Sequence, residues 1–566
     1  MKHLVIFLLA FVLGLGGYAA PVDINNAKMT AQSMLGCVVN VRMSSVNQPR
    51  KAHGTKDFDA PAYYVFTREE GNGFVIVSGD DVLPALVAYS YQTSFPADGV
   101  MPPALSDYLD AYASLVDAVR GSDAVMASAR RTASALPVVE PLCKTKWDQK
   151  TPYNMFCPQI GEKRCPVGCV ALAMAQIMKY FEWPTQGIGK VTYTPSNVKI
   201  PLTVDFSQST YQWDAMLNTT TELKNNEDAA RAVAKLCYDC GVSARMEYDV
   251  DASASYDDYA IQSMCENFGY KGSTMRILYR DCFAKQQEWY DILKAELDAG
   301  RPVLYGGLGS DVGGHEFVVD GYDSNDFFHV NWGWGGSYDA YFDINVLDAA
   351  PTMSFSESQS MIVGMEPDYA GTDRVLASVV PYLESSLSIK NSISLGRERL
   401  VRVTNIYNRS RSAQTWFFGM GLFDMDGNIV ANLTIDEKSQ SISSMKGLAA
   451  TTVSFSIPSD TPNGEYVLSL IFRPKNLDDW LLPNVVGGAQ NNRVYVRVHD
   501  GVADVYDMAA SIYNICINGD NADNAEVVSH QYFDMSGLPC KKGTKGYVLD
   551  IQTLSNGEKR VRKVLF

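Results

Sequence analysis

One cysteine, one histidine and one asparagine are the residues of this chain that could do chemistry together. Cys169 opens the apolar run CVALAMAQIMKY, just after Pro166 and Gly168 interrupt regular structure. His315 follows 146 residues later (315 − 169), behind two glycines, and Asn331 lies 16 residues beyond it (331 − 315). A thiol, an imidazole and an amide that meet in a fold can attack an acyl carbon, transfer its protons and orient the imidazole.

A buried helix is expected to carry the thiol. The run from Val170 to Phe181 has no proline or glycine and is apolar nearly all round, which predicts a helix packed inside the protein. A cysteine at a helix start lies near unbonded N–H groups and the positive end of the helix dipole, so we expect a pKa for Cys169 below the usual value of about 8.5. On this stretch alone, a small core cysteine is an equally good interpretation.

Two predicted strands are expected to bring the downstream partners together. The runs from Glu316 to Asp320 and from Phe327 to Trp332 are strand-like, and a turn at 323–326 separates them. Side chains on neighbouring strands can meet side by side, so His315 and Asn331 are expected to lie close together.

Long motifs around these residues resemble the streptopain family of bacterial papain-like cysteine proteases. They read GCVALAMAQIMKY, GGHEFVVDGY and HVNWGWGG, and the order and separation of Cys and His also fit the roughly 130 to 150 residues of papain-like enzymes. The resemblance implies Cys169 as nucleophile, His315 as base, Asn331 as the residue that orients the imidazole, and Trp332 as a shield. The further match WDQKTPYN would make Gln149 the oxyanion-hole donor.

Substrate is expected to pass close to the histidine strand. Val312, Gly313, Gly314 and Trp332 are the expected substrate-binding residues, since glycines let another backbone approach.

Other polar residues near His315 are expected to be structural. His329, two residues before Asn331, lacks the glycine lead-in. Strand alternation places Glu316 on the face opposite His315, where we expect a solvated or packing role.

The domain organisation is expected to be α+β at the centre and β-rich toward the end. The expected segments are a signal peptide at 1–19, an inhibitory propeptide at 20–136, a papain-like two-lobed cysteine protease domain at 137–367, an Ig-like β-sandwich at 368–500, a linker at 501–525 and a C-terminal β segment at 526–566. The last resembles the sorting signals of Bacteroidetes-type secretion, and the sequence 121–136 has the small, polar, basic character of a cleavable connector.

The composition limits the classes of partner that this protein is expected to bind. A net charge of −16 disfavours nucleic acid, and beyond the signal peptide we find no apolar run of spanning length, so we expect an exported protein with no stable membrane span. Its expected partners are protein or peptide substrates and its own propeptide.

Eleven cysteines in an exported chain could form disulfides, with at least one left over. Cys157, Cys165 and Cys169 lack zinc-site spacing, and Cys237 with Cys240 lacks a thioredoxin context, so we expect no metal and no cofactor.

The expected function is a secreted cysteine endopeptidase made as a zymogen. Two alternatives use the same residues differently. A non-proteolytic acyl transferase or amidase would share the thiol chemistry, and a binding or inhibitor protein would retain the fold without reaction.

Overall fold

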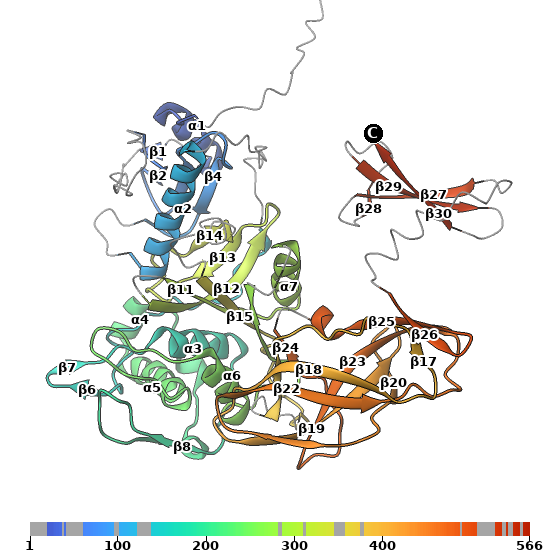
Figure 1. Ribbon diagram of the computed structural model, residues 1–566. Coiled ribbons are helices and arrows are strands. Elements are labelled where there is room, and N and C mark those ends of the chain that lie inside the picture. The colour runs from blue at the N-terminus through green and yellow to red at the C-terminus, as the bar shows by residue number, and fades with distance from the viewer. Residues whose placement is uncertain are drawn as a thin grey trace, which may run out of the picture. The chain divides into compact units, whose positions relative to one another are not determined.

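The computed structural model describes residues 20–36, 39–40, 60–95, 101–121, 137–280, 283, 286–309, 313–344, 357–373, 379–486, 489–506, 527–534, 539–540, 547–554 and 559–565. The expected signal peptide, the connector at 122–136 and Val312 lie outside these residues. The chain divides into two units (Figure 1). The first is Met1–Val380 with Arg409–Ser412 and Val486–Gly488, and the second is Pro381–Asn408, Ala413–Val485 and Ala489–Phe566.

The N-terminal part of the first unit combines two helices with a small sheet, as the propeptide segment predicts. Its elements are α1 (Ile24–Leu35), β1 (Val39–Asn40), β2 (Tyr63–Arg68), β3 (Phe74–Ser78), β4 (Leu86–Ser90) and α2 (Pro103–Gly121). Asp23 caps α1 by accepting from the Asn25 N–H at 2.6 Å. Arg120 near the end of α2 pairs with buried Asp80 at 3.0 Å, which ties this helix to the segment after β3.

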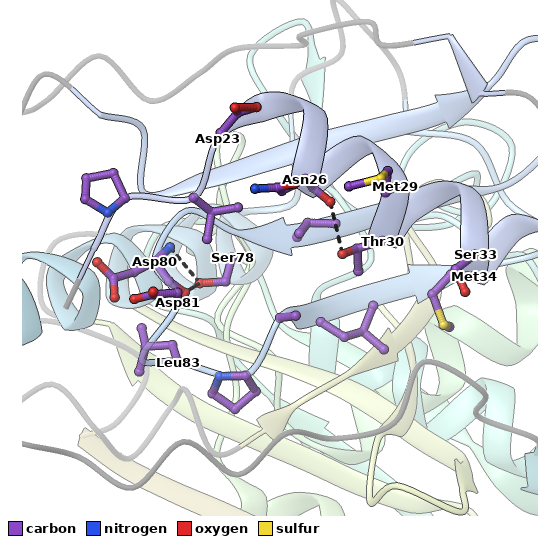
Figure 2. Close-up of a pocket in the computed structure, with 16 residues that line it drawn as sticks. Asp23, Asn26, Met29, Thr30, Ser33, Met34, Ser78, Asp80, Asp81 and Leu83 are labelled. Carbon is purple, nitrogen blue, oxygen red and sulfur yellow. Dashed lines mark hydrogen bonds between the residues drawn. The ribbon is translucent and has the colours of Figure 1, made fainter. Parts of the chain in front are cut away.

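A pocket of about 640 Å³ opens between α1 and the segment from β3 to β4 (Figure 2). Its carboxylates already have partners: Asp81 accepts from the Ala20 N–H at 2.9 Å, and Asp80 pairs with Arg120. We therefore assign these polar groups to the packing of this region.

The next region contains the helix that carries Cys169, together with further helices. They are α3 (Cys169–Phe181), α4 (Thr220–Lys224), α5 (Glu227–Ser243), α6 (Asp257–Glu266) and α7 (Gln286–Asp298). Every residue of α3 from Val170 to Met178 is buried, as its all-round apolar sequence predicts. Two short hairpins accompany these helices: β6 (Gln159–Ile160) with β7 (Lys163–Arg164), and β8 (Lys190–Tyr193) with β9 (Leu202–Asp205).

One eleven-stranded sheet runs through both regions of the first unit (Figure 1). Its order is β1-β2-β3-β4-β14-β13-β12-β11-β15-β10, with β5 beside β12. The strands not yet given are β5 (Pro137–Val139), β10 (Arg276–Tyr279), β11 (Val303–Gly309), β12 (Gly313–Asp323), β13 (Phe328–Asn331), β14 (Ala340–Phe342) and β15 (Glu357–Val363). The two regions join where β4 pairs antiparallel with β14, Tyr89 opposite Tyr341.

A single apolar core spans that join. It includes Leu105 and Tyr108 of α2, Leu293 of α7, and Phe317 and Trp332 of the sheet. The N-terminal region is thus packed on the sheet that carries the histidine.

The second unit is built of strands and one 3-10 turn, η6 (Ala489–Asn492), in its described residues. A four-stranded sheet has the order β22-β18-β16-β24, and a seven-stranded sheet has the order β17-β26-β25-β23-β19-β20 with β21 beside β19. Their strands are β16 (Tyr382–Leu383), β17 (Ile393–Ser394), β18 (Arg399–Asn408), β19 (Gln414–Phe423), β20 (Ile429–Asn432), β21 (Ser439–Ile442), β22 (Lys446–Phe455), β23 (Gly464–Pro474), β24 (Asn484–Val485), β25 (Val494–His499) and β26 (Val502–Tyr506). A further sheet, β28-β27-β29-β30, is formed by β27 (Val527–Asp534), β28 (Pro539–Cys540), β29 (Tyr547–Leu554) and β30 (Lys559–Leu565).

Free thiols within the described residues include Cys143, Cys157, Cys165, Cys169, Cys237 and Cys240. All of these except Cys169 are buried, so they pack in the interior as small side chains.

Candidate active site

Gly168 sets the start of the helix that carries Cys169. Its φ of 91° lies in the range that favours glycine, and a Cβ there would meet Met246 Sδ at 2.6 Å and the Ser253 carbonyl at 3.0 Å. The chain therefore turns into α3 directly before Cys169, whose side chain is half-buried.

The thiol of Cys169 lies among main-chain N–H groups. The N–H groups of Glu316, Val170 and Cys169 itself favour its ionised form, but burial outweighs them and raises the pKa of Cys169 above its usual value. The expectation of a lowered pKa is therefore wrong for this structure. The helix start supplies donors as expected, whereas no imidazolium bonds the thiol among the described residues.

His315 is buried on β12, with 7% of its surface exposed. Its Nε2 lies 3.3 Å from the carbonyl oxygen of Trp332, and its ring stacks on Phe317 with centroids 6.4 Å apart. Burial lowers the pKa of His315 to about 4, although the Trp332 carbonyl and Asp107 on α2 act in the opposite direction. The imidazole is thus neutral near pH 7 and close to a carboxylate of the N-terminal region.

Asn331 ends β13 with its side chain buried and hydrogen-bonded through both its oxygen and its nitrogen. Its Oδ1 accepts from Gln176 Nε2 at 3.2 Å and from the Gly333 N–H at 3.1 Å, while Nδ2 donates to the Thr145 carbonyl at 2.8 Å. The expected hydrogen bond from the imidazole to Asn331 Oδ1 is therefore not made here. The ring bonds instead to the carbonyl of the next residue, Trp332.

Trp332 packs against the aromatic side of the histidine strand. Its ring lies 4.8 Å from that of Phe317 and 5.3 Å from that of Phe342. The main-chain N–H of Trp332 donates to Asp339 Oδ1 at 3.0 Å. Burial raises the pKa of Asp339 to about 7. These contacts fix the main chain whose carbonyl bonds His315.

Gln149 is tied to the segment that leads into the nucleophile. Its carbonyl accepts from the Val167 N–H at 2.9 Å, two residues before Cys169, and its side chain is partly exposed.

The glycines before the histidine lie inside β12. Gly313 and Gly314 pair with Gly309 and Leu308 of β11, so this strand begins earlier than the sequence predicts. Gly314 is exposed and lines the pocket that also holds Cys169 and His315. Val312 is outside the described residues.

His329 is bound in a separate buried network. Its Nδ1 lies 2.6 Å from Asp320 Oδ1, and Asp320 Oδ2 accepts from the Cys143 N–H at 2.9 Å. Burial lowers the pKa of His329, but the Asp320 carboxylate raises it more. This arrangement fits the structural role expected for His329.

The residue that the sequence interpretation missed is Glu316. It lies buried next to Cys169, lines the same pocket, and has Asp257 at the start of α6 within hydrogen-bonding reach. Strand alternation does place it away from His315, but the face it occupies is covered by helices rather than by water. Its position directly after His315 in the sequence was the available signal.

No group of three or more His, Cys, Asp or Glu side chains suited to a metal ion occurs among the described residues.

Known families match both regions of the first unit. The model of the Peptidase C10 family matches residues 147–342, and that of the Spi protease inhibitor matches residues 19–116. The first stretch contains Cys169, His315 and Asn331, and the second contains β1 to β4 and most of the two N-terminal helices.

Similar proteins extend over the same stretches. Streptopain of Streptococcus pyogenes is 34% identical over 329 residues, which cover 54% of this chain and 80% of streptopain. The chain belongs to the peptidase C10 (streptopain) family. A second family relative is the thiol protease/hemagglutinin PrtT of Porphyromonas gingivalis, 28% identical over 372 residues that cover 62% of this chain and 42% of PrtT. A prointerpain A fragment of Prevotella intermedia, in mutant form, is 29% identical, covers 58% of this chain and 100% of the fragment, and has a TM-score of 0.49.

Membership of the C10 family makes the chain a cysteine-type peptidase that carries an inhibitory propeptide, as streptopain-type zymogens do. In the described part of the chain, every helix is too short or too polar to cross a bilayer.

Proposed function

We propose that Cys169 is the nucleophile of a secreted endopeptidase, with His315 as base, Asn331 as the group that orients it and Gln149 as an oxyanion donor. The observation that carries this assignment is the placement of Cys169. Its thiol lies at the start of a buried helix, meets the N–H groups of residues 169, 170 and 316, and shares one pocket with His315.

In the proposed mechanism, the Cys169 thiolate attacks a peptide carbonyl carbon. The Cys169 N–H and the Gln149 amide stabilise the negative charge on the carbonyl oxygen. The protonated His315 donates its proton to the departing amine, and the neutral imidazole then takes a proton from the water that hydrolyses the acyl-enzyme.

The bonds of His315 support a latent state. The ring is buried and neutral, and its hydrogen bond goes to the Trp332 carbonyl rather than to the thiol. Asp107 of α2 acts on it from the propeptide side. We infer that the docked propeptide keeps the imidazole in a position where it cannot form the ion pair with Cys169, and that release of the propeptide lets the pair form.

The finer domain organisation is part of the proposal. The signal peptide at 1–19 would direct export, and a cut in the connector at 122–136 would release the propeptide. Residues 137–367 would form the two-lobed papain-like domain, helices in one lobe and sheet in the other. The seven-stranded sheet and the sheet β22-β18-β16-β24 of the second unit would form an Ig-like β-sandwich at 368–500, followed by the linker at 501–525 and a β segment at 526–566 that serves in secretion.

The assignment is tested with the full chain and its Cys169→Ala variant. Wild type should hydrolyse casein once a thiol reductant is present and lose activity when iodoacetamide labels Cys169, while Cys169→Ala should be inactive and remain uncut. Full casein hydrolysis by Cys169→Ala would disprove the assignment. Transfer of acyl groups to added amines without net hydrolysis would favour the acyl transferase alternative.

A further inference from the structure

The pocket that contains Cys169 is lined by acidic side chains. Its volume is about 460 Å³, and the residues around it come from the starts of α3 and α6, from the segment 247–256 before α6, and from β10, β11, β12 and β15. The acidic members are Glu247, Asp257, Asp258 and Glu316. None of the described residues that line it is a lysine or an arginine.

Glu316 is the buried centre of this acidic group. Only 9% of its surface is exposed, and its Oε2 has no hydrogen-bond partner among the described residues. Its carboxyl group fills the space that Gly306 leaves open, because a Cβ at Gly306 would lie 1.7 Å from Glu316 Oε1. Burying a carboxylate is costly unless a cation or several donors satisfy it. The site therefore holds a carboxyl group with no lysine or arginine among its described lining residues.

Asp257 adds a second carboxyl group beside the first. Its Oδ2 accepts from the Ser360 hydroxyl at 2.6 Å, which holds it at the pocket wall. Burial, then Asp257 and the Cys169 thiol, raise the pKa of Glu316 well above its usual range. A positively charged group that entered the pocket would reverse this effect and pair with both carboxylates.

The connector sequence contains a fitting ligand. Between residues 122 and 136, where a cut would separate the propeptide, the only cationic residues are the adjacent Arg130 and Arg131. If the pocket prefers a basic side chain, the enzyme would cleave the connector next to these arginines rather than among the small and apolar residues around them.

We propose that this pocket binds a lysine or arginine side chain of the substrate, at one of the two residues before the scissile bond, and that Glu316 determines this preference. The proposal rests on the proposed function, since it assigns Cys169 as the nucleophile. A long basic side chain can extend into the pocket with its methylene groups along the wall. Its charge would then lie at Glu316 and Asp257.

The test uses the self-processed full chain and matched fluorogenic peptides that differ in one residue. Arginine, glutamine, leucine or glutamate is placed at the first or second position before the scissile bond. We expect kcat/KM for arginine to exceed that for glutamine at least tenfold at one position. In Glu316→Gln, this ratio should fall at least tenfold. Glu247→Gln, at the exposed rim of the same pocket, is the matched control and should keep most of the preference.

A second measurement does not depend on how Glu316 variants fold. The new N-terminus of the self-processed wild type should be Arg131, Thr132 or Ala133, and Arg130→Gln with Arg131→Gln should slow self-processing at least tenfold.

The outcomes separate the two proposals. If wild type cuts peptides but shows no preference for arginine over glutamine at either position, the pocket proposal is overturned and the proposed function stands. An arginine preference that Glu316→Gln leaves unchanged, or a processing site without a basic residue in the two preceding positions, also overturns it. If wild type and Cys169→Ala behave alike on every peptide, it is the proposed function that fails.

Discussion

Gly168 shows how one residue can fix where a helix begins. Its φ of 91° favours glycine, and a Cβ there would press on the flexible end of the Met246 side chain and on the Ser253 carbonyl oxygen, so a substitution must strain the backbone and displace these neighbours.

Substitution of Gly168 should therefore lower the free energy of unfolding by more than backbone strain alone does. Gly161→Ala, at a φ of 63° with no atom within 4 Å of the added Cβ, is the control for backbone strain alone, at about 1–3 kcal/mol. Gly168→Ala should destabilise the full chain by clearly more than that and reduce iodoacetamide labelling of Cys169. Denaturant unfolding in the Cys169→Ala background measures the first effect. Equal destabilisation by both variants would mean that the close contacts at Gly168 relax without cost.

Asn331 has a structural duty that the sequence motif does not reveal. Asn331→Ala leaves Gln176 Nε2 and the Gly333 N–H without their acceptor, which should cost about 1–3 kcal/mol of stability. As the orienting residue, it should also lower kcat after self-processing at least tenfold. Gln176→Met removes one of the same bonds and should lower stability with kcat nearly unchanged. Equal losses of kcat in both variants would place Asn331 outside the catalytic machinery.

At the residue scale, the sequence predicts the reactive groups better than their bonds. Cys169 and His315 are found by their motifs and share a pocket. The bond of His315 to the Trp332 carbonyl, rather than to Asn331, depends on side-chain geometry that the motif does not contain. Glu316 was not predicted as a site residue, because strand alternation tells which face of a strand a residue occupies but not what covers that face.

At the scale of elements, helices were predicted closely and long-range pairing was not. The helix predicted over the run from Val170 to Phe181 is found as α3 (Cys169–Phe181) with nearly the same ends. The seam between β4 and β14 was missed, because two short strands far apart in sequence give no local sign that they pair.

Tyr89 makes that seam a target for mutation. Its ring stacks on Tyr341 with centroids 5.2 Å apart, and its hydroxyl donates to buried Asp323 at 2.7 Å. Tyr89→Phe leaves Asp323 without one donor only while the propeptide is docked, at a cost of about 1–3 kcal/mol. The lag before self-processing should shorten by roughly five- to a hundredfold. Tyr64→Phe, whose hydroxyl bonds Val22 within the propeptide region, is the control and should change the lag less.

At the scale of the whole molecule, latency and acidity should be linked through His315. Its pKa is about 4 in the folded, docked state against the ordinary value of about 6.5 in an unfolded chain, so the unfolded chain binds the extra proton between these values. The stability of the folded, docked state should therefore be unaffected above about pH 6.5 and should fall as the pH falls toward 4, by about 3 kcal/mol in all.

The linkage is measured in full-chain Cys169→Ala, which cannot cut itself in the proposed mechanism. Its denaturant stability between pH 7 and 4 is compared with that of the same protein carrying His315→Gln. The histidine-containing protein should lose more stability over this range. Parallel curves for the two proteins would show that His315 does not sense the pH in the docked state.

The α+β class and the β-rich C-terminal region follow from periodicity in the sequence, and the structure confirms both. The pairing of the N-terminal region with the histidine sheet is what periodicity could not supply, since two separately predicted domains prove to share one sheet and one core.

The shared sheet also means that maturation uncovers an edge. When the propeptide leaves, the backbone N–H and C=O groups of β14 that faced β4 lose their partners, and an exposed strand edge can recruit other extended chains. β14 has only three residues, Ala340–Phe342, so it offers little length for such pairing. The mature enzyme should thus remain monodisperse where a longer strand at the same position would invite self-association.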